Sequence, residues 1–80
     1  MYTTLKEVLA KADKYNFTVG SFNTHNLEML PYMIRAAKDM GSPISIQTSV
    51  GTARYIGYGV LASVCKYMAD NEGLDIVSWI

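Results

Sequence analysis

The sequence predicts an α/β fold built on parallel strands, and three observations support this prediction. Two short segments, residues 18–23 and 43–49, are rich in β-branched or aromatic residues and end in polar ones. Between them, residues 26–40 carry the apolar spacing of a helix, and Gly41 can end it. A strand, a helix and a second strand in this order give two strands that run in the same direction.

A helix over residues 5–15 is expected before the first strand. Thr4 and Glu7 have the spacing of a capping box, and apolar residues recur at helix offsets after them. Glu7 and Lys11 stand four residues apart and are expected to form an exposed ion pair. Asn16 can end this helix, and the first strand follows it.

The helix between the strands is expected to begin irregularly. Asn26 can cap it, and Glu28 in the first turn complements the positive end of the helix. Pro31 has no N–H and would crowd the carbonyl of Leu27, so we expect a kinked or delayed first turn. One face of this helix is apolar and carries Leu27, Leu30, Ile34 and Ala37.

The second strand alternates between apolar and polar side chains. Ile44 and Ile46 fall on one face, and the other face carries Ser45, Gln47 and Ser49. A strand covered by helices on both sides is usually apolar throughout, so the polar row predicts that this strand lines a cavity or the mouth of a barrel. The same alternation places Ser21 and Asn23 of the first strand on one face.

A third helix is expected after the Tyr/Gly-rich stretch of residues 55–59, with Glu72-Gly73 at its end. A third strand then begins at residues 74–77. A closed (β/α)8 TIM barrel needs about 250 residues. We therefore expect residues 1–80 to be the N-terminal part of a single barrel domain: a leading helix, two β/α units and a third-strand stub.

The composition excludes several classes of protein. Seven basic and seven acidic residues cancel, so nothing favours nucleic acid or a membrane surface as partner, and a small molecule is the expected ligand. No apolar run approaches the roughly 20 residues of a membrane span, and no targeting signal is recognisable. Cys65 is the single cysteine, which excludes a disulfide framework and favours a reducing, cytoplasmic location.

Asn23 and Ser49 are the candidate substrate-binding residues, because ligands of parallel α/β proteins bind at the carboxyl ends of the strands. Each has a purely structural interpretation as well. Asn23 could form an Asx turn or a helix cap, and Ser49 could be a turn hydroxyl before Gly51. His25 has no partner at metal-ligand spacing and is expected on a surface loop.

Three other features have mainly structural interpretations. Residues 49–52 follow a strand like a phosphate loop, but they lack the second glycine and the lysine of a P-loop. Arg54 is expected to be a solvated charge flanking a helix, and Cys65 a small core residue.

Two segments, GSFNTHNLE at residues 20–28 and SPISIQTSVG at residues 42–51, resemble class II ketose-bisphosphate aldolases, and the likeness runs from about Tyr2 to Val77. The resemblance implies a zinc-dependent (β/α)8-barrel lyase, expected to be a homo-oligomer. Such an enzyme reversibly cleaves a fructose- or tagatose-type bisphosphate, a sugar phosphate, into dihydroxyacetone phosphate and an aldehyde. By this resemblance, Asn23 matches the asparagine beside the enediolate and Ser49 matches a serine that contacts substrate.

Residues 78–80 depart from this family. Members continue the third strand into His-Leu-Asp-His, which supplies the acid/base aspartate and a zinc histidine, whereas this sequence reads Ser78-Trp79-Ile80. With one histidine, the chain is expected to lack a three-ligand zinc site and to be inactive alone, so no residue is assigned as catalytic or metal-binding. We interpret the tail as a truncation, for which a frameshift or an assembly error near Val77 is one origin.

Two alternatives remain open from the sequence. A small flavodoxin-like module could hold a phosphate or nucleotide at the loop after Ser49 without catalysis. A structural fragment could instead pair its open sheet edges with another chain.

Overall fold

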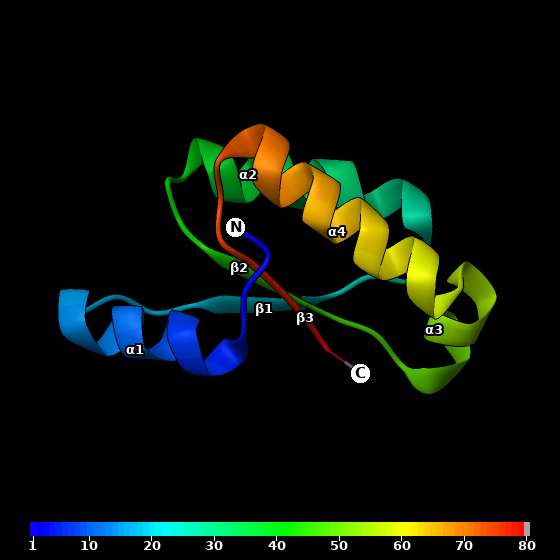
Figure 1. The fold of residues 1–80 in the computed structure, drawn as a ribbon, viewed down its shortest axis with the longest axis horizontal. Helices are drawn as coiled ribbons and strands as arrows, with labels where there is room; N and C mark the ends of the chain where they lie inside the picture. The colour runs from blue at the N-terminus through cyan, green and yellow to red at the C-terminus, as the bar shows by residue number, and fades with distance from the viewer. Residues whose placement is uncertain (80) are drawn as a thin grey trace.

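The fold is a three-stranded parallel sheet between helices (Figure 1), and the computed structural model describes residues 1–79. The strands are β1 (Gly20–Asn23), β2 (Ile44–Gln47) and β3 (Ile76–Trp79), in the order β1-β2-β3. Both pairs of neighbours are parallel. The α/β class and the parallel sheet predicted from the sequence are confirmed.

Helix α1 (Leu5–Tyr15) has the predicted bounds. The hydroxyl of Thr4 accepts a hydrogen bond from the N–H of Glu7 at 3.2 Å, so the expected N-cap is formed. Asn16 ends the helix in the left-handed conformation, with φ 58°. In Figure 1, α1 lies across the sheet from α2 and α4.

The prediction of an ion pair between Glu7 and Lys11 is wrong. Lys11 Nζ instead lies 2.6 Å from Asp75 Oδ2, and the N-terminal ammonium lies 3.3 Å from Asp75 Oδ1. The prediction considered only residues of the same helix. In the folded chain, the carboxylate of Asp75, just before β3, lies within hydrogen-bond distance of Lys11. The hydrogen bond from Lys11 holds the pKa of Asp75 below its ordinary value. Asp75 therefore ties α1 to the amino end of β3.

The irregular start of the second helical segment is confirmed. A 3₁₀ turn, η1 (Leu27–Met29), precedes helix α2 (Leu30–Asp39). Asn26 Oδ1 accepts a hydrogen bond from the N–H of Met29 at 3.0 Å, as the capping prediction requires. Pro31 stands in the first turn of α2, where a missing N–H costs no intrahelical hydrogen bond.

The segment between β2 and β3 holds two helices, of which the sequence predicted one. Helix α3 (Val50–Ile56) was not predicted, and helix α4 (Tyr58–Glu72) is the predicted third helix. Gly57 has φ 98° and separates them, a conformation that favours glycine. Gly51 and Gly57 have low helix propensity, and for this reason the sequence did not predict α3.

The core lies between the sheet and the two helices α2 and α4. Leu30 and Ile34 of α2 contribute to it, and Ile46 and Ile76 face them from the sheet, all with no exposed surface. Cys65 of α4 is also buried there, as predicted, and burial raises the pKa of its thiol to about 11. Among residues 1–79, no helix combines the length and apolar character needed to cross a membrane.

Candidate functional site at the carboxyl edge of the sheet

The carboxyl edge of the sheet brings the predicted site residues to the same end of the fold. The register pairs Asn23, the last residue of β1, with Gln47, the last residue of β2. Thr24 N–H then donates to the Gln47 carbonyl at 3.0 Å, so the two strands stay paired beyond this point. Ser49 follows two residues after Gln47, at the start of α3.

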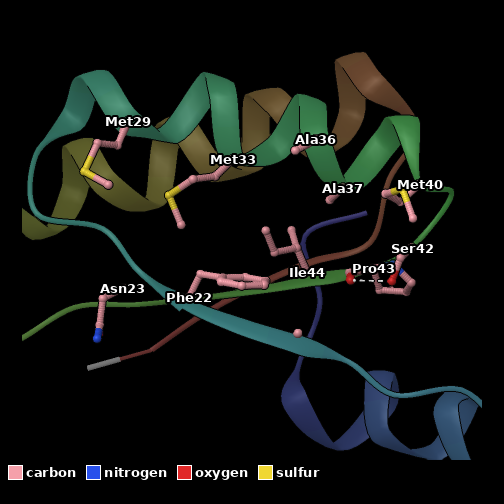
Figure 2. A pocket seen from close by; sticks show the side chains of 11 residues that line it. Phe22, Asn23, Met29, Met33, Ala36, Ala37, Met40, Ser42, Pro43 and Ile44 are labelled. Atoms are coloured by element: carbon pink, nitrogen blue, oxygen red, sulfur yellow. Dashed lines mark hydrogen bonds between the residues drawn. The ribbon is translucent and has the colours of Figure 1, made fainter.

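Asn23 is exposed and points away from helix α2. Figure 2 shows its side chain on the face of β1 opposite the ring of Phe22, as strand alternation requires. The same alternation and the register put Ser21, Ser45 and Gln47 on the face of the sheet that carries Asn23. An exposed amide at this edge can donate to and accept from the oxygens of a polar ligand.

A chain of hydrogen bonds crosses all three strands on this polar face. Trp79 Nε1 donates to Ser45 Oγ at 2.8 Å, and Ser21 Oγ donates to Gln47 Oε1 at 3.0 Å. The hydroxyl oxygens of Ser21 and Ser45 are 3.4 Å apart. Because Ser21 has one hydroxyl hydrogen, Ser45 can complete the chain by donating to Ser21. The polar row therefore does not leave Ser45 open to a cavity, since its side chain is buried and satisfied.

Sequence reasoning missed Trp79, because residues 78–80 were interpreted as a tail that departs from the family pattern. The structure places Ser78 and Trp79 in β3, paired with Ile46 and Gln47. The available signal was the alternation of Ile76 and Ser78 with Val77 and Trp79, which continues the period of a strand. Since Gln47 Oε1 is held by Ser21, the amide N–H groups of Gln47 remain available as donors.

Ser49 serves as the N-cap of α3. Its Oγ accepts a hydrogen bond from the N–H of Thr52 at 3.2 Å, and its hydroxyl donates to Thr52 Oγ1 at 3.0 Å. The sequence had suggested a turn hydroxyl before Gly51, whereas the structure makes Ser49 a helix cap. Ser49 is exposed, and its second lone pair can accept from a ligand while the cap is kept. Donating to a ligand oxygen would require its hydroxyl hydrogen to leave Thr52 Oγ1.

Thr48, between Gln47 and Ser49, carries an orphan polar group. Its hydroxyl is buried and has no hydrogen-bond partner among the described residues. A buried hydroxyl without a partner costs free energy of about 1 to 3 kcal/mol. The sequence pattern gave no indication of this, because a threonine suits a strand end equally well.

The described residues do not fit a zinc site. No three histidine, cysteine, aspartate or glutamate side chains of residues 1–79 gather closely enough to hold a metal ion. His25 is exposed, as predicted, Cys65 is in the core, and Asp75 is engaged by Lys11 at the other end of the sheet. Arg54 is exposed in the last turn of α3, as expected for a solvated charge.

Comparison with known proteins assigns the chain to a family. Residues 3–79 match the family model "Fructose-bisphosphate aldolase class-II". A fructose-bisphosphate aldolase of Streptococcus pyogenes serotype M3 is 39% identical over 66 residues, 81% of this chain and 22% of the relative. A fructose-bisphosphate aldolase of Helicobacter pylori is 39% identical over 64 residues, 80% of this chain and 21% of the relative.

Parallel strands joined through helices, with amide and hydroxyl side chains at their carboxyl edge, define an α/β protein. The chain belongs to the class-II fructose-bisphosphate aldolase family. It spans about a fifth of the length of the curated relatives that it matches.

Proposed function

We propose that residues 1–80 form the first part of a single (β/α)8-barrel domain. The consecutive strand order β1-β2-β3 supports this, and so does the position of α2 and α4 on one face of the sheet (Figure 1). A flavodoxin-like sheet has the strand order 2-1-3-4-5, in which the second strand lies outside the first, whereas the second strand here lies between the first and the third. The alternative of a flavodoxin-like phosphate- or nucleotide-binding module is therefore disfavoured.

The function that this arrangement supports best is class II ketose-bisphosphate aldolase activity. The reaction is the reversible cleavage of a fructose- or tagatose-type bisphosphate to dihydroxyacetone phosphate and an aldehyde. The observation that carries this proposal is the parallel register that pairs Asn23 with Gln47, two residues before Ser49, in a chain whose residues 3–79 match the aldolase family. Asn23 and Ser49 would hydrogen-bond the substrate's oxygens without adding charge.

Zinc chemistry needs residues beyond those described. In a class II enzyme the metal polarises the ketose carbonyl. Because His25, Cys65 and Asp75 are dispersed over the fold, the described residues supply no such site. The contribution of this chain is to bind and orient the substrate. We infer that the 80-residue chain alone does not catalyse the reaction.

A chimera tests the proposed function. The segment of the Streptococcus pyogenes aldolase that matches this chain would be replaced by the corresponding residues, and cleavage of fructose 1,6-bisphosphate and of tagatose 1,6-bisphosphate would be measured with and without zinc. Zinc-dependent cleavage of either substrate is the expected result. A chimera that folds by circular dichroism and binds zinc, yet cleaves neither substrate, would contradict the proposal.

A further inference from the structure

Trp79 lies in the same row of side chains as the residues of the candidate site. The register pairs Asn23 of β1 with Gln47 of β2, and Gln47 with Trp79 of β3. Residues paired across parallel strands point to the same face of a sheet, so these three side chains stand side by side at the carboxyl edge. Trp79 therefore belongs to the polar face by its position, although its side chain is mostly apolar.

A hydrogen bond anchors the indole ring to the neighbouring strand. Trp79 Nε1 donates to Ser45 Oγ at 2.8 Å, and Ser45 is buried, with 1% of its surface exposed. Ser45 stands two residues before Gln47 on β2, so the ring reaches diagonally across the strand pair, a distance that aromatic side chains span. The ring is therefore held over β2 and is not free to turn into solvent.

The rest of the ring offers an apolar surface. Trp79 is 45% exposed. Its Nε1 is the only polar atom of the side chain, and Ser45 already accepts its hydrogen. The exposed part of the indole is therefore carbon, which can contact the C–H groups of a ligand but cannot bind its oxygens.

Hydrogen-bonding groups border this carbon surface. Ser21 Oγ donates to Gln47 Oε1 at 3.0 Å, so the amide N–H groups of Gln47 can donate to a ligand. Asn23, one strand further, has an exposed amide that can donate or accept. Ligand sites typically combine an apolar or aromatic surface with a few placed polar groups. This combination suits a polyol, whose carbon skeleton carries C–H groups between its hydroxyl groups.

The placement of Trp79 does not depend on which sheet edges are open. Helices α2 and α4 cover the opposite face of the sheet (Figure 1), and in a (β/α)8 barrel the helix-covered face is the outer one. The face that carries Trp79 then lines the interior, and its carboxyl end opens on the mouth of the barrel, where ligands bind. Completion of the barrel would therefore leave the ring at the ligand site.

We propose that Trp79 forms an apolar wall of the substrate site, with the C–H face of a ketose phosphate against its ring. The amides of Gln47 and Asn23 bind oxygens of the same ligand. C–H groups on oxygen-bearing carbons are slightly positive and the face of an aromatic ring is negative, so this contact is favourable beyond the area that it buries. In this role Trp79 positions the ligand and takes no part in bond cleavage. The ligand class rests on the proposed function.

Tryptophan fluorescence tests this role, because Trp79 is the only tryptophan of the chain. Fructose 1,6-bisphosphate added to the 80-residue chain is expected to change the emission of Trp79 along a saturable curve and to protect the ring from quenching by acrylamide. Inorganic phosphate, which carries charge but no C–H groups, is expected to do neither. An emission that fructose 1,6-bisphosphate leaves unchanged, or that inorganic phosphate changes equally, would overturn the proposal.

Two substitutions separate the aromatic face from apolar bulk. Trp79→Leu keeps an apolar side chain without the ring, and calorimetry is expected to show a dissociation constant for fructose 1,6-bisphosphate raised about three- to tenfold. Trp79→Phe restores a ring, and its constant is expected to lie closer to that of the unsubstituted chain. The matched control is Tyr67→Leu, which removes an exposed ring from α4 and is expected to leave the constant unchanged. Equal constants for Trp79→Leu and Tyr67→Leu, with circular dichroism unchanged, would contradict the role of the ring.

These results are separable from those of the aldolase chimera. A folded, zinc-binding chimera without activity, together with ring-dependent binding of fructose 1,6-bisphosphate by this chain, would overturn the proposed function and support the role of Trp79. An active chimera, together with binding that Trp79→Leu does not weaken, would overturn the role of Trp79 and leave the proposed function in place.

Discussion

At the residue scale, the two buried threonines beside the candidate site differ in a way that can be measured. Thr24 Oγ1 donates to the carbonyl of Asn26 at 2.7 Å, whereas Thr48 Oγ1 has no partner among residues 1–79. Thr48→Val removes a buried polar group of nearly the same shape, so the free energy of unfolding is expected to rise by about 1 kcal/mol. Thr24→Val is expected to lower it by a similar amount. Urea unfolding measures both, and a destabilised Thr48→Val would show that this hydroxyl is satisfied in solution.

Asp75 makes the stability of the fold depend on pH. The pKa of Asp75 is lowered chiefly by the hydrogen bond from Lys11. Ionised Asp75 therefore stabilises the fold fully above its unfolded pKa of 3.8, and this stabilisation is lost as the pH falls through its lower folded pKa. The Asp75→Asn variant is expected to be less stable than the natural chain at neutral pH. The two stabilities are expected to converge below pH 3.8. A difference that persists unchanged into strong acid would exclude the ion pair as its cause.

The sequence was sufficient to place Asn23 and Ser49 at the same edge of the sheet. The alternation of apolar and polar side chains marks each strand, and the turn residues that follow mark where it ends. It did not reveal that Ser49 caps a helix, since α3 is short and rich in glycine. Nor could it predict the bond between Trp79 and Ser45, which lie 34 residues apart in sequence. Interactions across strands depend on register, and register is fixed only when the whole sheet forms.

At the scale of elements, capping explains where the helices begin. Asn26 satisfies the N–H of Met29 at the start of η1, which compensates for the irregular turn before Pro31. Asn26→Ala is expected to lower the free energy of unfolding by about 1 kcal/mol. His25→Ala is the matched control, because His25 is exposed and adjacent. Thermal unfolding of both variants measures the effect, and equal melting temperatures would contradict the capping assignment.

Glycine in the first turn of α4 is a site for stabilisation. Gly59 lies in this helix, and a Cβ built there meets no atom within 4 Å. Gly59→Ala is therefore expected to raise the free energy of unfolding by about 0.5 to 1 kcal/mol through helix propensity. Gly57→Ala is the contrasting change, since φ 98° at Gly57 disfavours any side chain. If Gly59→Ala destabilises the chain in chemical unfolding, α4 does not start at Tyr58 as described.

The elements whose signals are local were predicted well. Helix α1, the delayed start of α2 and the end of α4 at Gly73 all follow from capping residues, proline and glycine near each boundary. The strands were predicted to within a few residues, and β1 begins later than expected, at Gly20. Strand bounds depend on the neighbouring strand rather than on local sequence, which accounts for the larger error.

At the scale of the whole molecule, the described residues form a layer of sheet and helices. In this part of the chain, β1 pairs with one strand, whereas β3 pairs with β2 and, through an isolated bridge at Ile76, with Tyr2. The polar face carries Asn23 and Gln47 at one end. The apolar groove between β1 and α2 is lined by Phe22, Met29 and Met33, and Asn23 borders it as well.

The most direct measurement is the catalytic efficiency of the aldolase chimera with Asn23→Ala, beside His25→Ala as the control. Asn23 is expected to contact the oxygen that becomes negatively charged during cleavage, so its loss should reduce kcat by about 10² to 10³. His25→Ala should leave kcat within a small factor of the unsubstituted chimera. Equal activity of the two variants, with zinc bound and the fold intact, would contradict the assignment of this sheet edge as the substrate site.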